Sequence, residues 1–219
     1  MNNNTNIPFH LSDIQTFQYL HAAISEKRDS HHAVITLLGS ANTQPFQIQR
    51  IVPEYLEQLE PYVNKTIFML GGRGDQGSVM NTCVTECHQR KFYTFVVGIE
   101  PVFDLGEKIP PERVFAFKNI SLRCYALTQL SDILIVFPGG LGTIQEIIVP
   151  LMHRKLDTPM PHALQGPRSI FIATDLSNPV TEFLTILPDR QFVSGGKSIP
   201  LISVTVSNFY EMFSNSLFI

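Results

Sequence analysis

The chain has 219 residues, of which 44% are hydrophobic and 16% charged, a balance typical of a globular protein with a well-buried core. The net charge of −3 excludes a basic field for nucleic acid or for an anionic membrane surface. Because no linker, internal repeat or low-complexity tract interrupts the sequence, we expect one domain over residues 1–219, with a polar, disordered stretch at 1–10.

The sequence shows neither a membrane span nor a secretory signal. Its apolar runs are too short to cross a bilayer, and the first residues lack a basic segment followed by an apolar one. Cys83, Cys87 and Cys124 form no C-x-x-C pair, so we expect reduced, buried thiols in a cytoplasmic protein. His88 stands beside Cys87, but a metal site would need a further ligand, and we expect none.

Helical patterns alternate with short apolar runs along the whole chain. In chain order, the sequence predicts a helix over 11–27, a strand over 33–39, a helix over 46–63, a strand over 66–72, a helix over 78–90, a strand over 92–99, a loop over 100–112, a short strand over 114–117, a helix over 120–131, a strand over 132–137, a helix from about 143, a strand over 169–174, a helix over 178–187, a strand over 201–206 and a helix over 207–215. The strands are apolar on both faces. We therefore expect an α/β fold, a Rossmann-like three-layer sandwich with a mostly parallel central sheet.

Small residues follow three of the predicted strands. They are Gly39-Ser40, Gly71-Gly72 and Pro138-Gly139-Gly140. In open parallel sheets, ligands bind beyond the carboxyl ends of the strands, where glycines allow close approach and the next helix offers free N–H groups. The three turns together predict a phosphate-binding crevice. Neither the G-x-G-x-x-G fingerprint nor the P-loop pattern is present, which argues against dinucleotide binding and ATP hydrolysis.

One motif is more specific than these turns. The segment PGGLGTIQE at 138–146 matches P-G-G-x-G-T-x-x-E, and Arg123 stands fifteen residues ahead of the motif proline. In these features the chain resembles the LOG ("Lonely guy") family, which is also described as lysine decarboxylases. The glycine loops LLGSAN at 37–42 and GGRGDQGSVM at 71–80 are similar to loops of that family, so that the resemblance spans about residues 33–206.

The resemblance implies an activity and a site. Members of the family are cytokinin-activating phosphoribohydrolases, which cleave the N-glycosidic bond of a nucleoside 5′-monophosphate to a free base and ribose 5-phosphate. By position in the motifs, the catalytic residues would be Arg123 and Glu146. AMP or an N6-modified AMP would be the substrate, without cofactor or metal, in a homodimer. The phosphate and substrate would be held by Ser40, Gly72, Gly139, Gly140, Gly142 and Thr143.

Two residues of the motif also admit a purely structural interpretation. Thr143 and Glu146 have the T-x-x-E spacing of a capping box, in which the glutamate would fold back to satisfy its own helix end. A helix N-terminus would also favour the ionised form of Glu146, which suits stabilising positive charge at ribose C1′ or aligning water. The chain departs from the family pattern at Cys124 and Gln145, where the family usually has lysine and an acidic residue.

Other functions remain open at this point. Molybdenum-cofactor carrier proteins resemble this fold and share a similar motif, but they hold a phosphorylated pterin without cleaving it. A nucleotide-sensing protein would bind tightly with negligible turnover. Lysine decarboxylation is disfavoured, because it needs a pyridoxal cofactor and its lysine, and no lysine stands in a plausible glycine-framed pocket.

Overall fold

A computed structural model describes residues 13–28, 33–42, 44–72, 74–100, 108–155, 166–186 and 199–217. The stretch predicted to be disordered, 1–10, and the first two residues of the first predicted helix lie outside these ranges.

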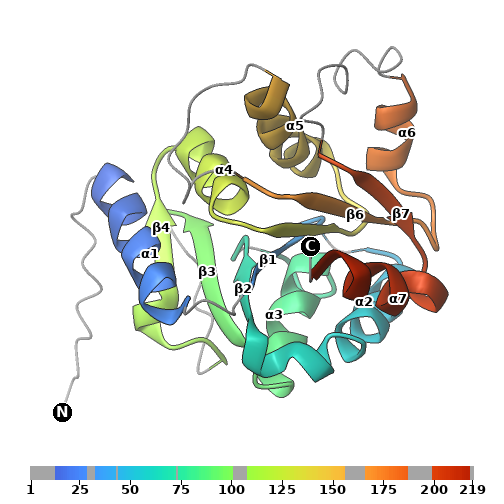
Figure 1. Cartoon of the computed structure of the whole chain (residues 1–219), viewed down its shortest axis with the longest axis horizontal. Coiled ribbons are helices and arrows are strands. Elements are labelled where there is room, and N and C mark those ends of the chain that lie inside the picture. Colours follow the sequence, from blue (N-terminus) through green and yellow to red (C-terminus); the bar gives the residue numbers. More distant parts are fainter. Residues whose placement is uncertain are drawn as a thin grey trace.

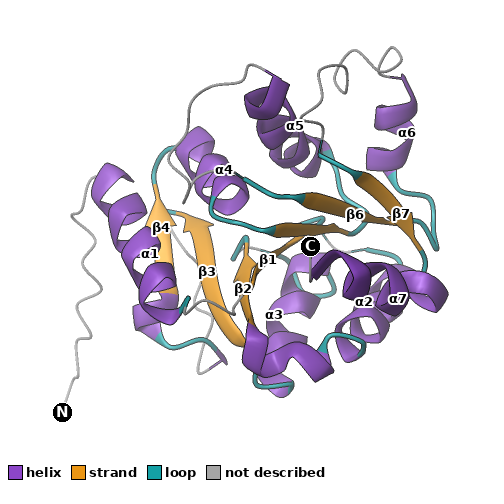
Figure 2. Cartoon of the chain, in the orientation of Figure 1, coloured by secondary structure: helices purple, strands orange, loops and turns teal. Residues whose placement is uncertain are grey.

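A single seven-stranded sheet forms the centre of the molecule (Figure 2). The strand order is β4-β3-β2-β1-β5-β6-β7, and every neighbouring pair is parallel. The predicted parallel sheet is therefore confirmed, and it is parallel throughout. The strands are β1 (Ala33–Leu38), β2 (Thr66–Leu70), β3 (Tyr93–Ile99), β4 (Val114–Phe117), β5 (Ile133–Val136), β6 (Ser169–Ala173) and β7 (Leu201–Val204).

Helices cover both faces of this sheet (Figure 1), which gives the three-layer sandwich. One face carries α2 (Phe46–Glu57), α3 (Val79–Gln89) and α7 (Val206–Leu217). The other face carries α1 (Asp13–Lys27), α4 (Ile120–Gln129), α5 (Leu141–Lys155) and α6 (Pro179–Ile186). Two 3₁₀ turns, Glu60–Lys65 and Pro111–Arg113, precede β2 and β4. In the described part of the chain, no helix has the length and apolar character of a membrane span.

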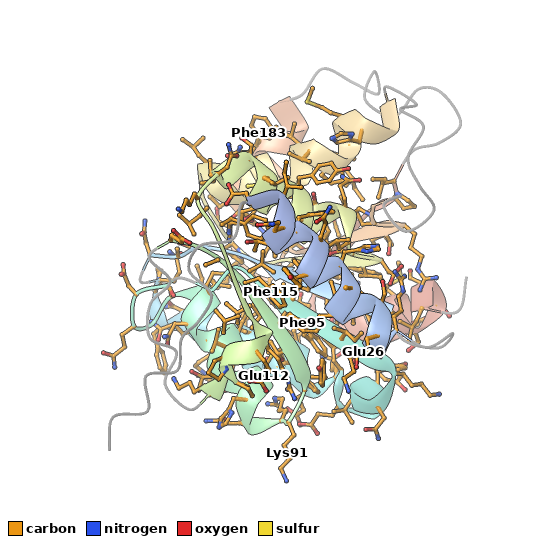
Figure 3. All side chains as sticks on the ribbon, turned by 90° about the vertical axis from the view of Figure 1, so that its left-hand side faces the viewer. Glu26, Lys91, Phe95, Glu112, Phe115 and Phe183 are labelled. Atoms are coloured by element: carbon orange, nitrogen blue, oxygen red, sulfur yellow. The ribbon has the colours of Figure 1, made fainter. Side chains whose placement is uncertain are left out.

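The apolar strands fill the space between these layers because successive side chains point to opposite faces. In β1, Ile35 and Leu37 pack toward α2 and α3, whereas Val34 packs toward α1 and α4. Figure 3, which views the molecule from the side of α1, shows Phe95 and Phe115 beside that helix; their ring centroids are 5.8 Å apart. Burying both faces of every central strand explains why the sequence contains continuous apolar runs there.

Several predicted helix boundaries differ from the structure by two residues or more: α4 ends at Gln129 and α7 continues to Leu217. The helix predicted over 46–63 ends at Glu57, and a 3₁₀ turn with Pro61 near its start replaces the last turns. Proline has no N–H to donate to the preceding turn; α2 continues through Pro53, but it ends before Pro61, which lies at the start of the 3₁₀ segment. The helix expected from about 143 begins two residues earlier, at Leu141. This shift changes which residues of the motif lie at the helix end.

An ion pair closes the amino-terminal edge of the sheet. Arg28, just after α1, pairs with Asp132, just before β5, through one carboxylate oxygen. The second oxygen, Oδ2, accepts a hydrogen bond from the backbone N–H of Val34 at 2.7 Å. Asp132 thereby joins α1, β1 and β5, a structural role that agrees with its predicted place at a strand start.

Candidate active site

A pocket of about 390 Å³ opens at the carboxyl-terminal edge of the sheet. It lies where β1 neighbours β5, the point at which the strand order reverses direction. Ligands of doubly wound proteins bind at such a switch point. The pocket is lined by Leu38, Gly39, Ser40, Ala41, Asn42, Gly71, Met80, Ile99, Ile120, Arg123, Gly140, Leu141, Gly142, Thr143 and Glu146.

The amino-terminal end of α5 forms one wall of this pocket. The first intrahelical bond runs from the N–H of Ile144 to the carbonyl of Gly140 at 3.1 Å, so the N–H groups of residues 141–143 have no acceptor within the helix. The N–H of Ser40 donates to the carbonyl of Pro138 at 3.1 Å and holds the β1 loop beside this helix end. A helix end of this kind accepts phosphate or another anion.

Arg123 lies in the second turn of α4, and hydrogen bonds at the start of this helix fix its position. The carboxylate of Asp13 accepts hydrogen bonds from the N–H groups of Lys118 and Asn119, both at 2.8 Å, which anchors the start of α4 to α1. Asn119 caps the helix by accepting from the N–H of Leu122 at 3.0 Å. The capped first turn therefore fixes where the arginine side chain leaves the helix.

The guanidinium of Arg123 spans three elements. Nε donates to the carbonyl of Val97 in β3 at 3.0 Å, and Nη2 donates to the carbonyl of Gly71 after β2 at 3.0 Å. Nη1 donates to Oε1 of Glu146 in α5 at 2.7 Å. Short, charge-assisted bonds of this geometry hold both side chains in one orientation.

Glu146 is buried, with 7% of its surface exposed, although it lines the pocket. Among the described residues, only Arg123 hydrogen-bonds to its carboxylate, through Oε1. Burial raises the pKa of the Glu146 carboxyl above its ordinary value of 4.5, and the nearby Arg123 guanidinium opposes the rise. The carboxyl therefore retains its proton to a higher pH than an exposed glutamate does.

Two interpretations of Glu146 that the sequence allows do not hold in the structure: the alternative of a capping box, and the expected effect of the helix end. Because α5 begins at Leu141, Thr143 lies inside the first turn and not at the cap position, so no capping box forms. Glu146 turns toward Arg123 on the neighbouring helix. The expected stabilisation of its ionised form by the helix end also fails: Glu146 lies in the second turn, where the helix dipole is weak, and desolvation dominates.

The other predicted residues divide into two groups. Ser40, Gly140, Gly142 and Thr143 line the pocket together with Arg123 and Glu146. The Ser40 hydroxyl, however, is engaged within its own loop, where it accepts from Gln44 Nε2 at 2.8 Å.

Gly72 and Gly139 do not line the pocket. Gly72 has a positive φ of 76°, and an added Cβ there would lie 2.4 Å from Val96 Cγ1. An added Cβ at Gly139 would lie 2.1 Å from Thr143 Oγ1. Both glycines thus serve the packing of the turns around the pocket, and the glycine that faces the pocket after β2 is Gly71.

Several lining residues were not predicted from the sequence. Met80, Ile99 and Ile120 form apolar parts of the wall, and Asn42 adds a polar side chain. Met80 is the last residue of the GGRGDQGSVM loop, so its place in that motif was a usable signal. Ile99 and Ile120 had none, because apolar residues at a strand end and at a helix start are also typical of a core.

The cysteines are buried thiols, as predicted. Burial raises the pKa of Cys87 to about 12, which makes its thiolate inaccessible near neutral pH. Burial also raises the pKa of Cys124, and the charge of Glu146 adds to the rise while Arg123 opposes it. Within the described residues, no group of three or more His, Cys, Asp or Glu side chains could hold a metal ion.

The fold and the pocket define a class of protein: a doubly wound, all-parallel α/β protein with a helix end and a buried arginine–glutamate pair at the strand-order switch point. A family model described as "Possible lysine decarboxylase" matches residues 78–212. The chain belongs to this family, the LOG family that its motifs indicate.

Solved structures support the fold. The chain is similar to the molybdenum cofactor carrier protein of Chlamydomonas reinhardtii, with 15% identity, a TM-score of 0.60, and coverage of 86% of this chain and 99% of that one. It is also similar to the molybdenum cofactor binding protein of the phototrophic bacterium Rippkaea orientalis, with 14% identity, a TM-score of 0.58, and coverage of 85% and 98%. A comparison with curated proteins gave no significant match.

Proposed function

We propose that this protein hydrolyses the N-glycosidic bond of a nucleoside 5′-monophosphate, AMP or an N6-modified AMP, to the free base and ribose 5-phosphate. The proposal is carried by the ion pair of the part-buried Arg123 and the buried Glu146, in the wall of a pocket whose neighbouring wall is a helix N-terminus. A phosphate and the adjacent ribose need these two environments side by side. Membership of the LOG family, which includes phosphoribohydrolases, supports it.

The phosphate would lie at the start of α5. There the N–H groups of residues 141–143 and the Thr143 hydroxyl are donors, and the helix dipole favours a negative charge. Of the described residues that line the pocket, Arg123 and Glu146 are the charged ones, and their charges cancel. Among these residues, the donors available to a phosphate at this helix end are the backbone N–H groups and the Thr143 hydroxyl.

The ribose would face Glu146, because a carboxylate placed against the phosphate would be repelled. As the C1′–N bond breaks, its electron pair leaves with the base and positive charge develops on the sugar, which an ionised Glu146 stabilises. Water attacks C1′ and gives up a proton to Glu146, and the same carboxyl can return that proton to the base. Its raised pKa suits this return step, which an ordinary glutamate would perform poorly.

Arg123 would keep the carboxylate in place during these steps. Its bonds to the carbonyls of Val97 and Gly71 leave the guanidinium little freedom to move. The pair is thus held in advance of substrate binding, so no reorganisation is needed when charge develops on the ribose.

Homodimerisation is part of the proposal. Ile120 and Leu141, at the rim of the pocket, are 55% and 84% exposed. Large apolar side chains with this exposure beside a polar site favour contact with another surface, and a second copy of the chain is the partner that the family suggests. Light scattering coupled to size-exclusion chromatography would show a dimer that Leu141→Glu dissociates; a monomeric wild-type protein would contradict this part.

The test of the activity is direct. Purified protein is incubated with a panel of nucleoside monophosphates, and the free base and ribose 5-phosphate are quantified by chromatography. We expect equal amounts of the two products from at least one purine nucleotide. Release of neither product from any nucleotide would contradict the proposal.

A binding function without turnover is the alternative. The similar structures whose names refer to molybdenum cofactor carry or bind that cofactor, and their likeness to this chain covers most of its length. Stoichiometric molybdenum in the purified protein, measured by mass spectrometry, would favour a carrier. Tight binding of a nucleotide without product release would favour a nucleotide sensor. The position of Arg123, fifteen residues ahead of the motif proline and in contact with Glu146 at 2.7 Å, favours the enzyme.

A further inference from the structure

Gly71 has a relation to Arg123 that its neighbours in the glycine loop do not share. Its carbonyl accepts from Arg123 Nη2 at 3.0 Å. A Cβ added at Gly71 would lie 2.4 Å from the same Nη2 atom and 3.0 Å from Met80 Cε. The distance to Nη2 is shorter than non-bonded contacts allow and the distance to Met80 Cε is tight, so the guanidinium occupies the space that a side chain at this position would take.

The backbone of Gly71 does not itself require glycine. Positive φ angles occur at Gly72, Gly77 and Gly166 among the described glycines, and at Lys91, but not at Gly71. An alanine could therefore adopt the backbone conformation of Gly71 without strain. What excludes it is the arginine side chain, which comes from α4, 52 residues further along the chain.

We propose that Gly71 is a positioning residue for the Arg123–Glu146 pair: its carbonyl and its missing side chain together hold the guanidinium at the strand ends, and the guanidinium holds the Glu146 carboxylate. The proposal rests on the proposed function only in treating this pair as the reaction centre. The contacts themselves exist without substrate.

The effect of an alanine at this position follows from which atoms can move. Nη2 is the far end of a flexible side chain, so the clash moves the guanidinium and leaves the sheet intact. The Nη1 bond to Glu146 then lengthens or breaks. Among the described residues, Arg123 is the charged group that lowers the pKa of Glu146, against the rise caused by burial. With the guanidinium displaced, it opposes the burial-driven rise less, so the pKa of Glu146 rises further.

The test is a double-mutant cycle read by NMR. The titration of the Glu146 carboxyl is followed with ¹³C-labelled glutamate in the wild type, Gly71→Ala, Arg123→Lys and the double variant, and Glu146→Gln assigns the signal. We expect Gly71→Ala to move the midpoint to higher pH in the wild-type background and to have little further effect in the Arg123→Lys background, where Nη2 is gone. Equal shifts in both backgrounds, or no shift in either, would overturn the proposal.

The kinetic measurement separates this proposal from the proposed function. With AMP as substrate, Gly71→Ala should lower kcat about 100-fold, the cost of a misplaced reacting group, while KM changes much less. The acid limb of the pH–rate profile should move to higher pH. The wild type and all variants could fail to hydrolyse any nucleotide while the NMR titrations still show that the effect of Gly71→Ala depends on Arg123. In that case the positioning role of Gly71 stands and the hydrolase proposal fails. Unchanged kcat in an active enzyme contradicts the positioning role.

Gly72→Ala is the matched control at the next position. Its added Cβ would meet Val96 Cγ1 at 2.4 Å and the Gly98 Cα at 3.4 Å on a backbone with positive φ, so it should lower the melting temperature without shifting the Glu146 titration. If the single variant Gly71→Ala fails to fold, folding of the double variant Gly71→Ala/Arg123→Lys tests the same contact. A folded double variant confirms that the alanine clashes with Arg123, and an unfolded double variant refutes the proposal.

Discussion

Two arginine–carboxylate pairs lie at opposite edges of the sheet, and both involve the region of β1 and β5. At the amino-terminal edge, Arg28 and Asp132 have side chains that are 35% and 21% exposed, and both carboxylate oxygens are used, one by Arg28 and one by the Val34 N–H. At the carboxyl-terminal edge, the side chains of Arg123 and Glu146 are 14% and 9% exposed.

The two pairs differ in what each carboxylate is bonded to. Asp132 is bonded on both sides and ties three elements together, whereas among the described residues Glu146 accepts a hydrogen bond only at Oε1 and lines a pocket. Desolvation raises the pKa of Glu146, and a carboxyl with a raised pKa in a pocket is a candidate for a functional group. A carboxylate in a pocket that has one oxygen without a hydrogen bond from the described residues, such as Glu146, is a candidate for catalysis. A carboxylate with both oxygens hydrogen-bonded, such as Asp132, has a structural role.

The largest expected effect is on turnover. Glu146→Gln keeps the size of the side chain and can still accept from Arg123, but it cannot take or return a proton or stabilise positive charge. We expect kcat with AMP to fall on the order of 10²–10⁴-fold, because a general acid–base group is lost. Circular dichroism should show an unchanged fold. Turnover within a factor of two of wild type would contradict a catalytic role for Glu146, and the Arg123–Glu146 pair would then be structural, like Arg28–Asp132.

The second effect is on stability. Asp132→Ala leaves the buried N–H of Val34 without its acceptor, so we expect a loss of about 1–3 kcal/mol in the free energy of unfolding. Denaturant titration measures this loss. The kinetic constants of the folded enzyme should not change, since Asp132 lies at the edge of the sheet away from the pocket. A fall in kcat without a fall in stability would show that both pairs serve the reaction.

The third effect is on substrate affinity. Thr143→Val removes a hydroxyl at the start of α5 while keeping the shape of a side chain that is 3% exposed. Loss of one donor to a phosphate should raise KM about tenfold with little change in kcat. Thr128→Val in α4 is the control: it removes an equally buried hydroxyl that bonds to the carbonyl of Cys124, and KM should stay constant. Similar changes in KM in both variants would contradict the proposed binding of the phosphate at the start of α5.

The smallest effect is the dependence of stability on pH. The folded state raises the pKa of Glu146, so above about pH 4.5 the unfolded chain loses this proton more readily than the folded protein does. The ionisation of Glu146 therefore destabilises the fold as pH rises from 4.5 through the folded-state pKa. The melting temperature of Glu146→Gln, relative to wild type, should increase across this window and level off above it. A relative decrease would mean that Arg123 outweighs burial.

Much of this site could be predicted from the sequence, for identifiable reasons. Continuous apolar strands predict a parallel sheet because both faces are buried, and the P-G-G-x-G-T-x-x-E motif with Arg123 fifteen residues ahead indicated a pair that the fold brings to 2.7 Å. The predicted helix start at about 143 was wrong, because Leu-Gly at 141–142 carries no polar cap signal.

The choice between two adjacent glycines could not be made in the same way. Gly71 and Gly72 are indistinguishable in the sequence, yet one faces the guanidinium and the other supplies a positive φ against β3. That difference depends on the direction of a side chain from α4, a contact across 52 residues of chain. The rise in the pKa of Glu146 was missed for a similar reason, because desolvation depends on the packing around the side chain.

Whether Glu146 takes part in cleavage of the N-glycosidic bond can be measured from the products formed from AMP. The wild-type protein is incubated with AMP, and adenine and ribose 5-phosphate are measured over time beside the Glu146→Gln variant. Equimolar release of both products by the wild type, and almost none by the variant, is the predicted result. Intact AMP after prolonged incubation with the wild type and with a set of N6-modified analogues would contradict it.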